Sequence, residues 1–385
     1  MVQKQATSKR KPAARTRAAK SRPTSQKESL FVAVSSGSDI GNGSRNRTED
    51  NGDVAQLSVA EQQRLLDNFT TALGPILEAD NFAELLRDIK QALFERDFAA
   101  AFGREEYLDA YAARWSPTRA LCYAGIFRRH LPRHLKPLTP AQDNGSSSTP
   151  SSHVKMVCIG GCAAEHVAFA SYLQRQSVSP SSTAHSGSLT LVDSASWSSV
   201  STKFQNTLTS PIPLSKYASE TAKVANIPVL SRPEQLNLQV LQQDALLVTE
   251  AEWADIFTNV SMPAAVVVTL FFTLNELYSE GGIMQTTKFL KALEASLPDQ
   301  SLLLVVDSPG SYSEAALGKD KKKYPMQWLL HHTLTDPEST AQHWSRLESH
   351  DSIWFRLPEQ LEYPIPLEHM RYQLHLYRIN KANKT

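Results

Sequence analysis

A short apolar run that ends at two adjacent glycines constrains the fold of this chain more than any other segment. The run is Met156–Ile159, and the glycines Gly160 and Gly161 are followed by small residues and a helical pattern. A second apolar run ends at Asp193. This succession predicts a strand, a tight turn, a helix and a second strand, the unit with which α/β folds hold a nucleotide-like ligand. Glycine lets the backbone approach such a ligand, and Asp193 can accept hydrogen bonds from both hydroxyls of a ribose.

Four regions differ in composition. Residues 1–55 are polar, and within them the stretch from Lys4 to Lys27 holds nine basic residues and no acidic one. We expect this part to be a disordered tail that binds phosphate backbones or serves as a nuclear or nucleolar address, although a solvated tail without a partner is the alternative. Residues 56–131 have helical patterns, residues 132–153 are a linker, and residues 154–380 are an α/β domain with insertions at 174–188 and 209–233.

Start signals and apolar spacing predict the helices of the N-terminal region. Ser58–Glu61 is a capping-box pattern, from which a helix should run to about Ala72. Ser116-Pro117 suits the cap and first turn of another helix that reaches Arg129. Between them, Asn81 precedes an apolar stripe whose spacing predicts a core-facing helix: Phe82, Leu85, Leu86, Ile89, Leu93 and Phe94.

The remaining apolar runs predict the sheet. Strand-like and helical stretches alternate after residue 153, which favours parallel crossover units in a doubly wound α/β sheet. Leu236–Asp244 alternates apolar and polar residues, as an edge strand does, whereas Ala264–Leu270 is apolar throughout and suits a central strand. Ser352–Arg356 and Tyr372–Arg378 are predicted to be two further strands that pair with each other.

Composition excludes several classes of protein. No apolar stretch approaches the roughly 18 residues of a membrane span, so we expect a soluble protein. Three cysteines, Cys122, Cys158 and Cys162, are too few for a disulfide framework, which favours a reducing compartment. The eleven histidines, with His331 and His332 adjacent, complete no set of metal ligands with these cysteines, so we expect no metal.

The residues of the glycine turn narrow the choice of ligand. A dinucleotide site would use Gly-x-Gly-x-x-Gly, but Gly160 and Gly161 are adjacent here, and no Gly-Lys-Ser or Gly-Lys-Thr follows as in a P-loop. S-adenosylmethionine remains, since its sites combine a glycine-rich first turn with acids after the second and third strands. Asp193 and Asp244 hold those places, and Asp244 can accept from the adenine amino group. The expected cofactor-binding residues are Gly160, Gly161, Cys162, Ala163, Glu165, Asp193, Ser194, Asp244, Ala245 and Thr273.

Five longer motifs, in order along the chain, resemble a fungal family of class I methyltransferases whose characterised member methylates N3 of a uridine in large-subunit ribosomal RNA. They are Arg114–Arg119, Leu270–Leu277, Leu304–Glu314, Tyr324–Leu330 and Leu367–Tyr377. The resemblance implies a Rossmann-like, mostly parallel seven-stranded sheet, S-adenosylmethionine as cofactor, and large-subunit rRNA or a pre-ribosome as partner. It also implies a nuclear or nucleolar location, with the cytoplasm as an alternative, and we expect a monomer. Two other functions stay open: a methyltransferase for a protein or small molecule, and a ribosome-assembly factor that binds RNA without catalysis.

The end of the fourth strand is expected to carry the chemistry. Methyl transfer from a sulfonium needs mainly alignment of nucleophile and methyl group. N3 of uridine carries a proton that must be oriented or removed. Asn275 is expected to read the uracil edge and Glu276 to accept the proton, and these are the predicted catalytic residues. The structural alternatives are a helix cap for Asn275 and a surface ion pair for Glu276.

Further residues are expected around the site. Tyr312 is a candidate for stacking on the base, and the basic run Lys319–Lys323 with Tyr324 and Trp328 is a candidate for contacts with RNA phosphates. A structural turn and a solvated charge run are the respective alternatives. A third group is expected either to close over the cofactor or simply to pack: Tyr107, Tyr111, Arg114, Trp115 and Arg119.

Overall fold

The computed structural model describes residues 57–135, 153–176, 186–259, 265–310, 312–317, 320–335 and 343–381. The predicted basic tail and most of the predicted linker lie outside the described residues, as do residues 177–185 of the first predicted insertion. None of the helices in the described part of the chain is both long and apolar enough to cross a membrane.

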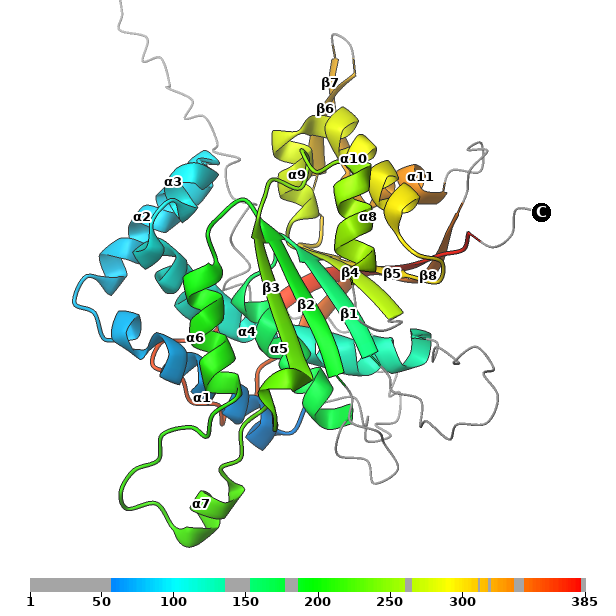
Figure 1. Cartoon of the computed structure of the whole chain (residues 1–385). Helices are drawn as coiled ribbons and strands as arrows, with labels where there is room; N and C mark the ends of the chain where they lie inside the picture. Colours follow the sequence, from blue (N-terminus) through cyan, green and yellow to red (C-terminus); the bar gives the residue numbers. More distant parts are fainter. Residues whose placement is uncertain are drawn as a thin grey trace, which may run out of the picture. The chain divides into compact units, whose positions relative to one another are not determined.

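A seven-stranded sheet forms the centre of the described chain, in the order β3-β2-β1-β4-β5-β9-β8 (Figure 1). The first five strands in this order are parallel, and β9 runs antiparallel to both β5 and β8. The predicted mostly parallel seven-stranded α/β sheet is therefore confirmed. The strands are β1 His153–Ile159, β2 Ser186–Asp193, β3 Leu236–Gln242, β4 Ala265–Phe271, β5 Leu302–Asp307, β8 Trp344–Phe355 and β9 Met370–Ile379.

The positions of individual strands follow from their hydrophobic patterns. β4 is the central strand and is buried along nearly its whole length, because helices cover both faces of the sheet there. β3 lies at the sheet edge and alternates in burial, as its sequence predicted. The two C-terminal strands, β8 and β9, pair as predicted, although β8 starts earlier, at Trp344.

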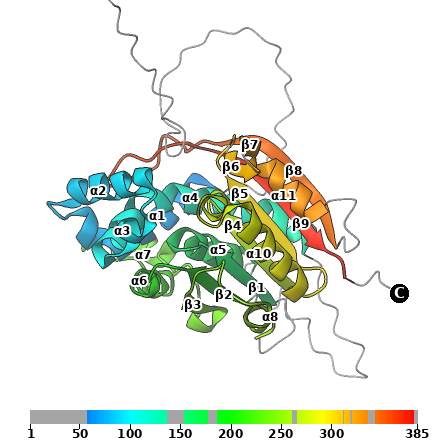
Figure 2. The ribbon, with the colours of Figure 1, turned by 90° about the horizontal axis from the view of Figure 1, so that it is seen from above.

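Two hydrophobic clusters occupy the two faces of the sheet. Successive residues of a strand point to opposite faces, so Met156 and Cys158 join one cluster while Val157 and Ile159 join the other. Figures 1 and 2 place α1–α3 on one side of the sheet and α10 and α11 on the other. The helices of the first side are α1 Val59–Leu77, α2 Phe82–Glu95, α3 Phe98–Phe102, α4 Glu105–His134, α5 Ala163–Gln176 and α6 Ser198–Leu208. Those of the second side are α8 Glu250–Thr258, α9 Leu274–Glu280, α10 Gly282–Ser296 and α11 Met326–Thr335.

Short elements occupy the segments expected to be loops. The helix α7, Glu220–Ala225, and the 3-10 turn η1, Pro233–Gln235, lie in or next to the second insertion. The first insertion is shorter than predicted, because α5 continues to Gln176 and β2 already begins at Ser186. After β5 the chain forms a hairpin of β6, Tyr312–Leu317, and β7, Asp320–Pro325, where sequence alone suggested a turn and a basic run. The roles predicted for Tyr312 and the lysines of β7 concern side chains outside those that the structure describes.

The start of the ordered N-terminal region is as predicted, with one error in the second helix. Ser58 caps α1 with a full capping box to Glu61. The backbone leaves helical geometry at Leu73, next to the predicted end at Ala72, and a further helical segment follows to Leu77. The stripe of α2 is buried except at Leu86, which is half-buried, and at Phe94, which is 59% exposed. Phe94 directly follows buried Leu93, and a step of about 100° per residue turns it away from the core face.

The helix start predicted at Ser116-Pro117 is wrong, because α4 is continuous from Glu105 to His134 and contains Pro117. Proline inside a helix removes the N–H that would bond to the carbonyl four residues earlier, here Ala113. The hydroxyl of Tyr363 donates to the Ala113 carbonyl oxygen at 2.9 Å. A side chain from the C-terminal part of the chain thus replaces the missing helical hydrogen bond.

We expect Tyr363→Phe to lower the free energy of unfolding by about 1 kcal/mol, because the partly enclosed Ala113 carbonyl then has no donor. In a Pro117→Ala background the alanine N–H can bond to Ala113, so the same Tyr363→Phe change should cost clearly less. Urea unfolding of the four proteins in this double-mutant cycle measures the difference. Equal costs in both backgrounds would show that Tyr363 does not act through this carbonyl.

Candidate active site

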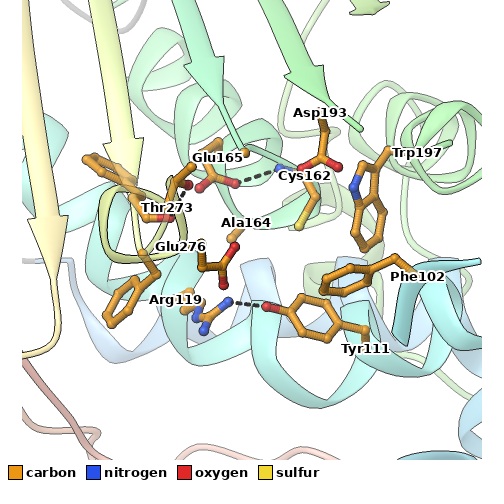
Figure 3. A pocket seen from close by; sticks show the side chains of 13 residues that line it. Phe102, Tyr111, Arg119, Cys162, Ala164, Glu165, Asp193, Trp197, Thr273 and Glu276 are labelled. Atoms are coloured by element: carbon orange, nitrogen blue, oxygen red, sulfur yellow. Dashed lines mark hydrogen bonds between the residues drawn. The ribbon is translucent and has the colours of Figure 1, made fainter. Parts of the chain in front are cut away.

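A cavity opens where the carboxyl ends of β1, β2 and β4 meet the middle of α4 (Figure 3). It holds about 470 Å³ of empty space, its open mouth included. Its walls come from the glycine turn, the ends of the strands and two helical segments. The lining residues are Phe102, Tyr111, Arg119, Gly160, Cys162, Ala164, Glu165, Asp193, Trp197, Phe271, Phe272, Thr273 and Glu276.

Gly160 is needed for the way the chain packs at the cavity floor. Its φ is +69°, and a Cβ atom there would lie 2.2 Å from Oγ1 of Thr273. Thr273 in turn donates to the Ile159 carbonyl at 3.0 Å, so the ends of β1 and β4 are joined at this point. A Cβ on Gly161 would lie 2.4 Å from Cβ of Cys158, and Gly161 does not line the cavity. The adjacent glycines therefore permit close packing of the turn, and Gly160 alone also faces the cavity.

A buried carboxylate organises the start of α5. Oε2 of Glu165 accepts from the Cys162 backbone N–H at 2.9 Å, and burial raises the pKa of Glu165 to about 7. Burial likewise raises the pKa of the Cys162 thiol to about 12, which keeps it neutral. Of the expected cofactor-binding residues in this turn, Glu165 and Cys162 line the cavity, whereas Ala164 lines it in place of Ala163. Their contacts with the cofactor stay a prediction.

Asp193 lies at the end of β2 with its side chain toward the cavity, beside Trp197 (Figure 3). Oδ1 accepts from the Ala195 N–H at 2.7 Å, which fixes the carboxylate. Burial raises its pKa to about 6, although that hydrogen bond works in the opposite direction. The next residue, Ser194, is exposed and does not line the cavity.

The structure does not bring the third-strand residues into the cavity lining. Asp244 is exposed, and its Oδ1 accepts from the Leu246 N–H at 2.9 Å as part of the turn after β3. Ala245 is buried in the hydrophobic cluster on the second face of the sheet. Their predicted role in holding adenine stays a prediction.

The turn after β4 directs Glu276 into the cavity. Phe272 in this turn has a φ of +56°, a left-handed conformation that is costly for a large side chain and is concentrated at functional sites. Its N–H donates to the Val306 carbonyl at 2.7 Å, so the turn is tied to β5. The Asn275 N–H donates to Oδ2 of Asp307 at 3.2 Å, and Asn275 is not among the lining residues. Of the two predicted catalytic residues, the cavity thus contains Glu276 only.

The pKa of Glu276 is raised to about 8, mainly by burial. The guanidinium of Arg119 acts against this rise, while the carboxylates of Asp307 and Asp193 add to it. A carboxyl group with such a pKa exchanges its proton near neutral pH, which is what a general base requires. The predicted alternative, a surface ion pair, does not fit this half-enclosed position.

Arg119 and Tyr111 close the cavity from α4. Nη1 of Arg119 donates to the Tyr111 hydroxyl at 2.7 Å, and the guanidinium lies 4.8 Å from the centre of the Phe272 ring. Burial raises the pKa of Tyr111 to about 12, so this hydroxyl stays protonated.

The other residues expected to cover the cofactor do not line the cavity. Arg114 pairs with Glu368, and the Trp115 ring packs on Tyr111 with 4.9 Å between the ring centres. Tyr107 lies under the Arg104 guanidinium. Packing, the alternative given above, explains the positions of these three side chains.

Phe102 and Trp197 line the cavity but were missed from the sequence. Both rings pack against Tyr111, with centres 5.0 Å and 6.0 Å away. Trp197 follows Asp193 by four residues, so its place after the second strand was a usable signal. Phe102 belongs to a five-residue helix far from the α/β domain in sequence, and nothing in its local pattern indicated the cavity.

The lining suits S-adenosylmethionine. Three carboxylates, Glu165, Asp193 and Glu276, face one guanidinium, Arg119, and burial raises the pKa of each carboxylate. A ligand with cationic sulfonium and ammonium groups would favour their ionised forms. Arg119 can pair with the cofactor's carboxylate, Asp193 can accept from ribose hydroxyls, and the aromatic rings provide apolar walls. The donors and acceptors therefore fit this cofactor.

A separate cluster joins the C-terminal end of α4 to β8. Oε1 of Glu348 lies 3.0 Å from Nδ1 of His130 and 2.5 Å from Nε2 of His134, and the three groups could hold a metal ion. Burial would raise the pKa of Glu348, but hydrogen bonds from the two histidines outweigh it and hold that pKa at about 2. The four-residue spacing of the histidines on one helix face was a signal that the sequence analysis overlooked. The hydrogen bonds account for the cluster, and the absence of a metal stays a prediction.

The sheet order and the cavity at the carboxyl edge define an α/β enzyme of the class I methyltransferase type. Residues 69–378 match a family of SAM-dependent methyltransferases, and the chain belongs to that family. The expected cofactor class and reaction type are thereby confirmed.

Known proteins that resemble this chain differ greatly in their sequence identity to it. The 25S rRNA (uridine(2843)-N(3))-methyltransferase of Saccharomyces cerevisiae is 32% identical over 353 residues, which cover 84% of this chain and 88% of the yeast protein. Among solved structures, an O-methyltransferase family protein from Burkholderia thailandensis is 13% identical with a TM-score of 0.36, over 84% of this chain and 72% of that one. The N-methyltransferase NodS of Bradyrhizobium japonicum, in complex with S-adenosyl-L-homocysteine, is 10% identical with a TM-score of 0.33, over 78% and 99% respectively.

Proposed function

We propose that this protein transfers a methyl group from S-adenosylmethionine to N3 of a uridine in large-subunit ribosomal RNA. The observation that carries the proposal is the 32% identity to the yeast 25S rRNA uridine-N3 methyltransferase over most of both chains. The match is not confined to the cofactor-binding half, since it extends over 84% of this chain.

The cavity chemistry supports a substrate that must lose a proton. N3 lies on the base-pairing edge of uracil, so the base has to leave its pairing partner and enter the cavity. Glu276, with a pKa near 8, can accept the N3 proton, and the resulting negative charge on the ring can be stabilised by the Arg119 guanidinium. When bound, the cofactor supplies the methyl group, and the carboxylates around it hold its charged end.

The remaining parts of the proposal follow from the substrate. We also propose that the protein's partner is large-subunit rRNA or a pre-ribosome, that it acts in the nucleus or nucleolus, and that it acts as a monomer.

The proposal predicts that one N3-methyluridine disappears from large-subunit rRNA in cells that lack the protein. Nucleoside mass spectrometry of purified rRNA measures the loss, and primer extension locates the position. Wild-type protein should restore the modification, and the Glu276→Gln variant should not. If every N3-methyluridine persists without the protein, the rRNA substrate is wrong, and a protein or small-molecule acceptor becomes the alternative.

A further inference from the structure

An exposed tryptophan lies between two arginines at the end of the last strand of the sheet. Trp354 of β8 is 50% exposed. The Arg356 guanidinium lies 5.1 Å from the centre of its ring, and the guanidinium of Arg371, on β9, lies 5.6 Å from it.

Strand pairing places this group at the same edge of the sheet as the cavity. Asp307, the last residue of β5, pairs with Gln373 of β9. Two residues closer to the start of β9, Arg371 pairs with Trp354 of β8. Adjacent strands are about 4.8 Å apart, so the three steps from β4 to β8 amount to roughly 15 Å. Stacked nucleotides at about 3.4 Å each cover that distance in about four steps.

The two arginines are available for a ligand. Among the residues that the structure describes, neither Arg356 nor Arg371 forms an ion pair with a carboxylate, and both are exposed. Nε of Arg371 donates to Oγ of Ser352 at 2.7 Å, which fixes the guanidinium next to the ring. A flat ring with fixed cations beside it matches a nucleotide, because the base can stack on the aromatic surface while the guanidinium groups bind phosphate.

The other exposed tryptophan of the described chain differs in this respect. Trp328 on α11 is 48% exposed, but its ring already stacks between Tyr324 and His332, with centres 5.3 Å and 5.1 Å away. No arginine flanks it in the described cation–π contacts. The combination of an open aromatic surface and two cations is therefore found at Trp354.

We propose that Trp354, Arg356 and Arg371 bind a nucleotide of single-stranded RNA about four nucleotides away from the one that enters the cavity. This inference rests on the proposed RNA substrate and adds a second contact point for it. These three side chains would contact the face of the base and the phosphates but not the base edge. They therefore increase the affinity for RNA and orient the strand, and they do not select a sequence.

The test is RNA binding by fluorescence anisotropy, with a labelled single-stranded oligonucleotide of about 12 nucleotides that contains uridines. Trp354→Ala should raise the Kd about tenfold, in line with the loss of one stacked base. Trp354→Phe should recover most of the affinity, and Arg356→Gln combined with Arg371→Gln should lower the salt dependence of binding. The Kd for S-adenosylmethionine should stay unchanged in all three.

Tyr217→Ala is the matched control. Tyr217 is 83% exposed and has the Lys216 ammonium 4.9 Å from its ring centre. It lies in the segment between α6 and β3, and β3 is the outermost strand on the side of the sheet away from β8. Its removal should not change RNA affinity.

The outcomes separate this inference from the proposed function. If wild-type protein binds and methylates RNA but Trp354→Ala binds as tightly as Tyr217→Ala, the nucleotide surface is wrong while the function stands. If wild-type protein binds S-adenosylmethionine but no RNA, the proposed function fails too. If Trp354→Ala weakens binding to a ribosomal protein and leaves RNA affinity intact, the surface is a protein contact and the inference is overturned.

Discussion

Asp193→Ala is expected to raise the Kd for S-adenosylmethionine about 100-fold. The carboxylate at the end of β2 is held by the Ala195 N–H and points into the cavity, where it can accept from two ribose hydroxyls. Hydrogen bonds to a charged group contribute roughly 1.5–3 kcal/mol each, and each 1.4 kcal/mol is about a tenfold change in affinity. Isothermal titration calorimetry of wild-type and variant proteins measures the change.

Stability provides the control for this variant. Burial raises the pKa of Asp193 from 3.8 to about 6. A raised folded-state pKa means that the carboxyl group's contribution to stability falls as pH rises from 3.8 through about 6, so the ionised group is a cost at neutral pH. Asp193→Asn should therefore keep or raise the Tm of the cofactor-free protein at pH 7.5 while it weakens cofactor binding. A variant that binds weakly only because it is partly unfolded would contradict the assignment.

The class of fold could be predicted from the sequence because its strongest signals are local. Buried parallel strands are continuous apolar runs, the edge strand alternates, and a glycine turn between strand and helix is conspicuous. Asp193, Glu165 and Glu276 follow directly from such landmarks, because each lies at or just after a strand end. The parallel arrangement then brings these ends to one edge, which is where the cavity formed.

The errors arose where distant contacts override local signals. Ser116-Pro117 has the form of a helix start, but Tyr363, about 250 residues later, satisfies the carbonyl that the proline leaves free. Phe102 reaches the cavity only because α3 packs on α4. The pairing of His130 and His134 with Glu348 likewise depends on how α4 crosses the sheet. The contacts of Tyr363 and Phe102 leave no trace in periodicity or spacing, whereas the spacing of His130 and His134 indicates their shared helix face but not their partner Glu348.

Glu276→Gln is expected to lower kcat about 100-fold and to weaken S-adenosylmethionine binding much less than Asp193→Ala does. Loss of a positioned general base typically costs 10²–10⁴-fold in rate, and glutamine keeps the shape of the side chain without its proton affinity. The pH profile is the more specific measurement. Because the free protein's Glu276 has a pKa of about 8, kcat/KM for the cofactor should rise about tenfold per pH unit below 8 and level off above it.

At saturating cofactor the same rise should end at a lower pH, because the sulfonium charge in the cavity favours the ionised carboxylate. In Glu276→Gln the rise that ends near pH 8 should be absent, and only the titration of Glu165 and Asp193 at lower pH should remain. Glu280→Gln is the matched control: this glutamate lies one helical turn further along α9, is exposed, and does not line the cavity. Its charge adds to the raised pKa of Glu276, so this variant should keep the slope of the profile and level off at a slightly lower pH. If Glu276→Gln retains the wild-type slope below pH 8, the N3 proton leaves by another route, and Glu276 serves only to balance the charge of Arg119 and the cofactor.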